Sequence, residues 1–170
     1  YFQSKLTGAY NLENILAAAR IGLEFGIDPL LIKKGIESYV PSNNRSQVLK
    51  KGTAVVLLDC YNANPSSMEV SIQNFLQIDE ANKVMVLGDM LELGSVSDDE
   101  HQKVVDSIEN SGIDAILLVG EKFLKTRSSS NILKFSNVEE MKDGLDSSFF
   151  TKKFILVKGS RGIQLEKVLE

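Results

Sequence analysis

The sequence AVVLLDCYNANPSSM, residues 54–68, joins an unbroken apolar run to a polar turn and then to the start of a helix. Residues 54–58 show no alternation of apolar and polar side chains, which is typical of a strand buried on both faces. Asn64 and Pro65 suit the first turn of a helix, because asparagine caps free amides and proline is tolerated there. A buried strand that leads through a short turn into a helix is the repeating unit of a parallel α/β sheet.

The same unit recurs along the chain, where VMVL, AILLV and FILV form three further apolar runs at residues 84–87, 115–119 and 154–157. Residues 46–59 indicate two short strands that turn at Lys51 and Gly52, the first of them an antiparallel edge, and a weaker strand is expected at 131–136. Helices are expected over 65–78, 98–112, 137–149 and 163–169. We therefore predict an α/β fold, with a Rossmann-like, mostly parallel sheet, one antiparallel edge strand and helices on both faces.

Residues before this pattern predict a short helical segment. Leu12, Ile15, Leu16, Ala19 and Leu23 recur at helical spacing and predict one buried face, Gly26 ends that helix, and Asp28 and Pro29 begin another. Pro41 and the polar residues 42–46 then break the pattern. We expect residues 5–42 to be the helical end of one domain and residues 43–170 to form a second. Residues 1–4, YFQS, match the remnant of a protease-cleavage tag.

Composition limits the classes of function. The formal net charge is −4 and no basic stripe is present, a poor profile for a nucleic-acid binder. A single cysteine, Cys60, excludes a disulfide within the chain, and no apolar run approaches the roughly 18 residues of a membrane helix. We expect a cytoplasmic protein. The sequence lacks a Gly-Lys pair, a Gly-x-Gly motif and a serine nucleophile elbow. If the chain serves a nucleotide enzyme, its phosphate-binding loop lies elsewhere.

Three expected strands end in polar turns, DCYNANP, GDMLELG and KGSRG, and ligands of open parallel sheets bind beyond the carboxyl ends of strands. Asp59 follows five apolar residues, so it either satisfies turn amides or accepts hydrogen bonds from a sugar diol. Asn64 is explained by turn and capping chemistry. Lys158 and Arg161 bracket a turn that either binds an anion or only exposes two cations to water.

The remaining polar candidates are weaker. Asp89 and Glu92 lie in the GDMLELG turn, where their carboxylates either hold an ammonium group or face water. His101 is the only histidine of the chain, and a solvated or capping histidine is favoured over a catalytic one. A single histidine cannot build a zinc site, and no metal ligand is predicted.

Together the motifs DCYNANPSSM, VLGDMLELG and LVKGSRG resemble, in order and spacing, the C-terminal domain of Mur ligases. The upstream sequence GAYNLENILAA resembles the last helical part of the central ATP-binding domain of that family. The resemblance implies an ATP-dependent ligase of peptidoglycan precursor synthesis. In that reaction a carboxylate of UDP-N-acetylmuramoyl-tripeptide becomes an acyl phosphate, the amine of D-alanyl-D-alanine attacks it, and inorganic phosphate leaves.

The resemblance also implies roles for individual residues. Arg45 would be catalytic and would reach the ATP phosphates from the domain junction. The ATP site would comprise Asn11 and Asn14 near the adenine, Arg45 at the phosphates, and Asp59 with Tyr61 at the ribose. The D-alanyl-D-alanine site would comprise Asn62, Asn64, Asp89, Lys158, Ser160 and Arg161.

Two residues depart from the family pattern, Tyr10 in place of histidine and Cys60 in place of serine. The phosphate-binding loop, the Mg²⁺ ligands and the UDP-binding domain of the family have no counterpart in this sequence. We therefore expect ATP and Mg²⁺ to serve the full-length parent, and the chain to be inactive without its own N-terminal and central domains. The alternatives are a stand-alone Rossmann-like nucleotide-binding or interaction module, and another ligase of the superfamily that adds glutamate or a different amino acid.

Overall fold

The computed structural model describes residues 1–6, 8, 11–146 and 148–170, so the Tyr10 departure lies outside the described residues. The core is a six-stranded sheet in the order β1-β2-β6-β3-β4-β5, in which the β1–β2 pair is antiparallel and the other neighbours are parallel. The strands are β1 Gln47–Lys51, β2 Ala54–Asp59, β3 Lys83–Gly88, β4 Ala115–Val119, β5 Ile132–Phe135 and β6 Phe154–Lys158. The predicted fold class, with its antiparallel edge strand, is confirmed.

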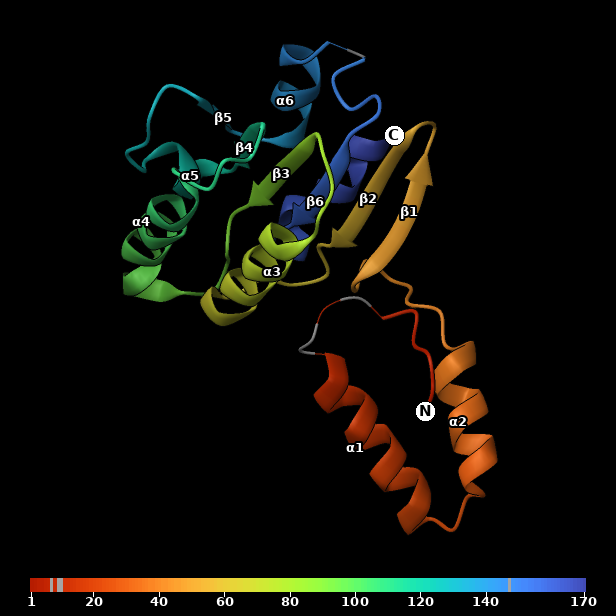
Figure 1. The fold of residues 1–170 in the computed structure, drawn as a ribbon. Coiled ribbons are helices and arrows are strands. Elements are labelled where there is room, and N and C mark those ends of the chain that lie inside the picture. Colours follow the sequence, from red (N-terminus) through yellow and green to blue (C-terminus); the bar gives the residue numbers. More distant parts are fainter. Residues whose placement is uncertain (7, 9–10, 147) are drawn as a thin grey trace.

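Helices cover both faces of the sheet (Figure 1). They are α3 Pro65–Gln77, α4 Ser97–Ile108, α5 Glu121–Leu124 and α6 Val138–Gly144, with short 3-10 helices η1 Gly94–Val96, η2 Arg161–Ile163 and η3 Leu165–Leu169. One apolar cluster joins α3 and α4 to the sheet, and a second joins α6 and η3 to the opposite face. The result is a three-layer domain, as the continuous apolar strands predict.

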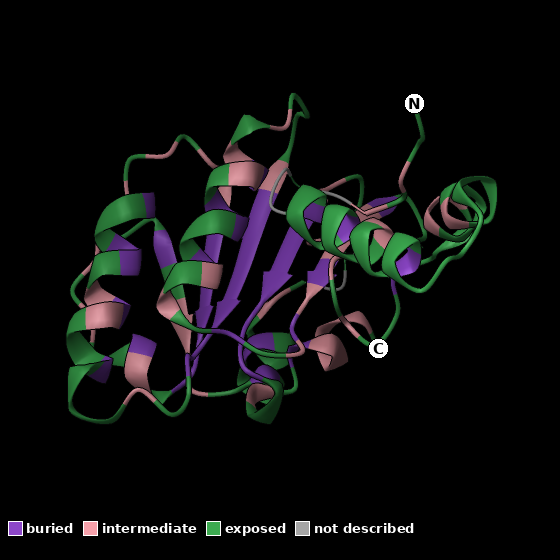
Figure 2. Ribbon diagram, turned by 90° about the horizontal axis from the view of Figure 1, so that it is seen from below, coloured by how far each residue is buried: buried purple, intermediate pink, exposed green. Residues whose placement is uncertain are grey.

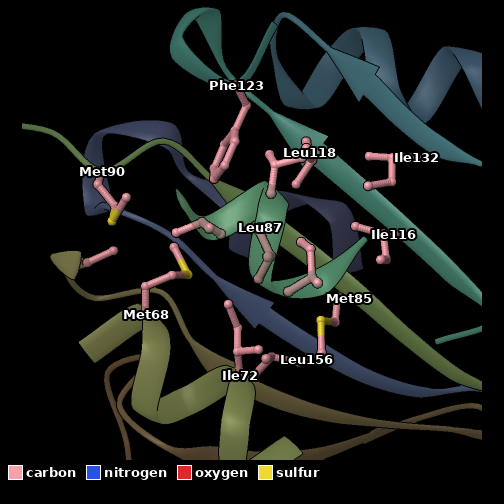
Figure 3. Packing of buried hydrophobic residues seen from close by; sticks show 14 of the residues in the cluster. Met68, Ile72, Met85, Leu87, Met90, Ile116, Leu118, Phe123, Ile132 and Leu156 are labelled. Atoms are coloured by element: carbon pink, nitrogen blue, oxygen red, sulfur yellow. The ribbon is translucent and has the colours of Figure 1, made fainter. Parts of the chain in front are cut away.

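The two clusters follow from the alternation of side chains along each strand. On β3, Met85 and Leu87 belong to the cluster of α3 and α4, whereas Val84 and Val86 belong to the cluster of α6 and η3. Figure 3 shows the first cluster, where Met68 and Ile72 of α3 lie close to side chains of the sheet. All six residues are almost fully buried, so β3 is the centre of the core.

The local capping signals also act as expected. Asn64 accepts a hydrogen bond from the Ser67 amide at 2.8 Å, and the Ser67 hydroxyl accepts one from the Asn64 amide, which forms a capping box at the start of α3. Asp28 accepts a bond from the Leu30 amide at 2.7 Å, at the start of α2 Pro29–Ser38. Gly26 has φ +69°, a conformation that glycine adopts readily, and it follows the end of α1 Asn11–Glu24.

The predicted burial of α1 is wrong for most of its apolar face. Ile15 is buried, but Leu12, Leu16 and Leu23 are each about half exposed, as Figure 2 shows for most of the helix. The two helices α1 and α2 pack on each other and lie beside the sheet domain, not within its layers. Sequence periodicity identified an apolar face, but its covering surface is not among the described residues. None of the described helices combines the length and apolar character that a membrane crossing requires.

Three further elements differ from expectation. The helix expected over 163–169 is instead a pair of 3-10 turns, with Gln164 between them in a left-handed conformation at φ +57°. The short helix α5 was not predicted, because four residues carry too little periodicity to be recognised. The helix expected over 137–149 ends at Gly144, and Ser147 lies outside the described residues.

Cys60 provides a test of the packed core beyond β2. Its thiol is buried within the second apolar cluster and lies 3.5 Å from a Glu166 carboxylate oxygen. Burial, and next the negative charge of Glu166, raise the pKa of the Cys60 thiol from 9.0 to about 12. A thiol with this pKa is almost entirely un-ionised at neutral pH, where it is a poor nucleophile.

We expect the free energy of unfolding to fall between pH 9 and pH 12 by more in the native chain than in Cys60→Ser. In that window the thiol ionises in the unfolded chain but keeps its proton in the folded one, so each pH unit costs about 1.4 kcal/mol of stability. Urea unfolding of both proteins at pH 8, 9 and 10 measures the difference. Parallel pH profiles for the two proteins would contradict the prediction.

Candidate functional site

The three polar turns lie at one edge of the sheet. Strands β2, β6 and β3 are neighbours and parallel, so their carboxyl ends point the same way. Asp59 ends β2, Lys158 ends β6, and Asp89 follows β3. The expectation that the three turns share one rim is therefore confirmed by the strand order.

An ion pair joins two of these strand ends. Asp59 and Lys158 are direct partners in the β2–β6 register, and the Lys158 ammonium lies 2.9 Å from a carboxylate oxygen of Asp59. The Lys158 side chain is only 2% exposed, and it also donates a hydrogen bond to the Asn62 carbonyl. The other oxygen of Asp59 accepts a bond from the Ser46 amide at 3.1 Å. The ammonium of Lys158 is thus paired with Asp59, while the Asp59 side chain remains 21% exposed.

Arg45 lies in a tight loop in front of β1. Its neighbours Asn44 and Ser46 have φ values of 58° and 45°, and Asn43 has 57°. Left-handed conformations cost energy for residues other than glycine, and asparagine tolerates them best. The Ser46 bond to Asp59 and a 3.1 Å bond from the Tyr61 amide to the Asn44 carbonyl fix this loop against the end of β2. The guanidinium carbon of Arg45 consequently lies 3.7 Å from the centre of the Tyr61 ring.

A cleft of about 780 Å³ opens beside this loop and is lined by residues of α1, of α2 and of the sheet edge. Eight of the eleven residues predicted at a site line it: Asn11, Asn14, Arg45, Asp59, Tyr61, Asn62, Asn64 and Lys158. Asn11 is buried, and the Asn14 amide donates a hydrogen bond to its side-chain oxygen at 3.2 Å. The structure therefore brings together the predicted nucleotide-binding residues from two separate segments of the chain.

Asp89 has a different environment from the one expected, because it does not line this cleft. It is only 3% exposed, and its two carboxylate oxygens accept bonds from the Lys122 and Phe123 amides at 2.9 Å each. These amides belong to the first turn of α5, so Asp89 caps a helix that lies 33 residues further along the chain. Gly120 permits the approach, since a Cβ atom there would lie 2.2 Å from the Asp89 carboxyl carbon.

Ser160 also forms its hydrogen bonds with groups of the protein itself. Its hydroxyl accepts a bond from the Leu91 amide at 2.9 Å and donates one to the Ala63 carbonyl at 3.4 Å. Its amide donates to the Asp89 carbonyl at 3.1 Å. One buried serine thus connects the turns after β2, β3 and β6. Arg161, the next residue, is exposed, and its guanidinium carbon lies 5.2 Å from the centre of the Tyr61 ring.

His101 is buried, so the solvated alternative of the two that were expected is wrong. Its Nε2 accepts a hydrogen bond from the Met90 amide at 3.0 Å, and its Nδ1 donates to the Ser97 carbonyl at 2.6 Å. The ring also contacts Phe123 edge-on, with the two ring centres 4.7 Å apart. Both nitrogens are therefore used to hold the turn after β3. Glu92 of the same turn is exposed, with φ +66°.

Sequence reasoning missed Ser46 and Gly120, which hold Asp59 and Asp89 respectively. Ser46 acts through its backbone amide, so its side chain carried no signal. Gly120 lies directly after a buried strand, where a glycine is a signal for close backbone approach. In the described ranges no group of three or more His, Cys, Asp or Glu side chains is placed to hold a metal ion.

The ion pair predicts an asymmetric response to mutation. Asp59→Ala leaves a buried ammonium without its carboxylate, whereas Lys158→Met leaves a carboxylate that still reaches water. We expect Asp59→Ala to lower the free energy of unfolding by about 3 kcal/mol, Lys158→Met to cost less, and the double variant to be more stable than Asp59→Ala alone. Urea denaturation measures all three, with Glu24→Ala at an exposed ion pair as the control. A double variant less stable than Asp59→Ala would contradict this reading.

The cap of α5 predicts a graded loss. Asp89→Ala removes the acceptor of two amides, one of them buried, and we expect a loss of about 2 kcal/mol in the free energy of unfolding. Asp89→Asn keeps one acceptor oxygen, so its loss should be smaller. Thermal or urea unfolding measures both variants, and hydrogen exchange at Lys122 and Phe123 locates the effect. Equal stability of Asp89→Ala and the native chain would rule out the cap.

Comparison with known proteins identifies the family. The sequence profile of the Mur ligase, glutamate ligase domain matches residues 44–161. A UDP-N-acetylmuramoyl-tripeptide–D-alanyl-D-alanine ligase of Treponema pallidum is 32% identical over 170 residues, which cover 96% of this chain and 37% of that protein. The ligase of the same name from Buchnera aphidicola subsp. Baizongia pistaciae is 35% identical, with coverage of 100% and 38%.

A crystal structure of MurF from Acinetobacter baumannii matches with a TM-score of 0.88 at 29% identity, covering 99% of this chain and 38% of that one. The chain therefore spans little more than a third of the length of these relatives. The resemblance predicted from the three polar turns is confirmed, and the chain belongs to the Mur ligase family, in which residues 44–161 match the glutamate ligase domain.

Proposed function

We propose that this chain is the C-terminal part of the ATP-dependent ligase that adds D-alanyl-D-alanine to UDP-N-acetylmuramoyl-tripeptide. The observation that carries the proposal is the cleft, which gathers Asn11 and Asn14 of α1 with Arg45, Asp59 and Tyr61 of the sheet domain. The names of the relatives, at 30% identity and above, support the choice of substrates. Both ATP and a UDP-linked peptide place the reaction in the cytoplasm.

In this proposal the cleft binds the nucleotide. The side-chain amides of Asn11 and Asn14 carry donors and acceptors that match the edge of an adenine. The exposed part of the Asp59 carboxylate accepts hydrogen bonds from the ribose diol, as acids at strand ends do. Arg45 then faces the phosphates, where its fork of donors stabilises negative charge as the acyl phosphate forms and breaks down.

The proposed dipeptide site is adjacent, at the turns after β2 and β6. Asn62 and Arg161 are exposed there and are the groups proposed to meet D-alanyl-D-alanine directly. Asn64, Asp89, Lys158 and Ser160 are committed to capping, to the ion pair and to the links between turns. We therefore assign these four residues a positioning role, which keeps the rim in shape.

The chain is proposed to need its parent for activity. The family reaction requires a phosphate-binding loop and Mg²⁺, and the described residues gather no ligand set that fits the metal. The exposed leucines of α1 and α2 suit burial against the rest of the central domain: Leu12, Leu16, Leu23, Leu30 and Leu31. Residues 5–42 would then complete that domain, and residues 43–170 would close over the nucleotide.

We expect Arg45→Ala and Asp59→Asn, introduced into the full-length ligase, each to lower kcat/KM for ATP by roughly 10²-fold. Each variant removes a contact to the nucleotide or to developing charge, and losses of that size are typical of single transition-state contacts. Phosphate release with UDP-N-acetylmuramoyl-tripeptide and D-alanyl-D-alanine measures the effect, and Glu24→Ala serves as a surface control. Near-native turnover in both variants would favour a binding module without ligase chemistry.

A further inference from the structure

Two arginines from distant parts of the chain meet at one aromatic ring. The guanidinium carbons of Arg45 and Arg161 lie 3.7 Å and 5.2 Å from the centre of the Tyr61 ring. Because both distances end at the same point, the two carbons are at most about 9 Å apart, the sum of the two values. A cation over an aromatic face is attracted by the ring, so Tyr61 holds two positive groups that would otherwise separate.

The backbone fixes each arginine in this place. The Tyr61 amide binds the Asn44 carbonyl, directly before Arg45, at 3.1 Å. On the other side, Ser160 precedes Arg161 and is held by the turns after β2 and β3. The backbone of each arginine is therefore fixed near Tyr61 by hydrogen bonds of the adjacent residue.

The two arginines differ from the nearby lysine in their ion pairing. In the part of the chain that the structure describes, neither Arg45 nor Arg161 forms an ion pair, whereas nearby Lys158 is paired with Asp59. Both arginines are exposed. The chain as a whole has a net charge of −4, so the two free cations are a local feature and not part of a general basic surface.

We propose that Arg45, Tyr61 and Arg161 form a clamp for one multiply charged phosphate group of the bound nucleotide. Two guanidinium forks match a phosphoryl group, which offers several acceptor oxygens and more than one negative charge. A terminal carboxylate offers a single charge and would leave one arginine uncompensated. The inference rests on the proposed function, but it moves Arg161 from the dipeptide to the phosphates and gives Tyr61 the task of pairing the two arginines.

Titration of the 170-residue chain with tripolyphosphate, by calorimetry and by amide NMR, tests the clamp. We expect one ion per chain, and roughly 10-fold weaker binding for Arg45→Gln and for Arg161→Gln, the loss of about one charge-assisted contact each. Arg127→Gln removes another exposed arginine and should leave the affinity unchanged. Tyr61→Phe keeps the ring and should bind as the native chain does, whereas Tyr61→Leu should bind as weakly as the arginine variants.

Three results would overturn the clamp. The first is that the native chain does not bind tripolyphosphate. The second is that the native chain binds two ions and each arginine variant binds one, with unchanged affinity. The third is that Arg161→Gln weakens binding of D-alanyl-D-alanine but not of tripolyphosphate. Titration with ATP separates the clamp from the proposed function. If ATP binds no more tightly than tripolyphosphate, the nucleotide cleft is refuted and the clamp stands as a phosphate site alone. If ATP binds more tightly and Arg161→Gln changes nothing, the clamp is refuted and the cleft stands.

Discussion

The contact between Asp59 and Lys158 is the constraint on which the proposed site depends. It joins the last residues of two adjacent parallel strands, and it satisfies an ammonium that is almost completely buried. An unpaired charge at that depth would be costly, so the ion pair holds the carboxylate at one position. The same carboxylate anchors the loop that carries Arg45, through the Ser46 amide. One ion pair therefore sets the positions of the predicted ribose-binding and phosphate-binding groups together.

The rim is built mainly from links between turns that are distant in sequence. Ser160 connects three of them, and Asp89 connects the turn after β3 to α5. His101 holds the same turn from the side of α4. Several residues that resembled ligand-binding groups are thus internal supports. This division explains how polar and exposed loops can keep a fixed geometry, since each loop is tied to its neighbours and not only to its own strand.

The sequence was a good guide to the sheet and a partial guide to the site. Continuous apolar runs predicted the buried strands, and Asn64 and Asp28 predicted helix starts, because those signals are local. The roles of Asp89 and His101 could not be predicted from the sequence, because their hydrogen-bond partners are backbone amides that lie 33 and 11 residues away. The burial of α1 was misjudged for a related reason, because an amphipathic face does not reveal whether its covering surface is present.

The loop at residues 43–46 has a consequence for movement between the α1–α2 segment and the sheet domain. Three of its residues occupy left-handed backbone conformations, and two hydrogen bonds, one to the Asp59 carboxylate and one from the Tyr61 amide, tie it to the end of β2 and the turn that follows. Such a connection has few alternative backbone conformations, so it is a rigid segment and not a hinge. A rotation of α1 and α2 relative to the sheet domain would then have its hinge before this loop, near Pro41. Arg45 would keep its position relative to the sheet domain during such a rotation.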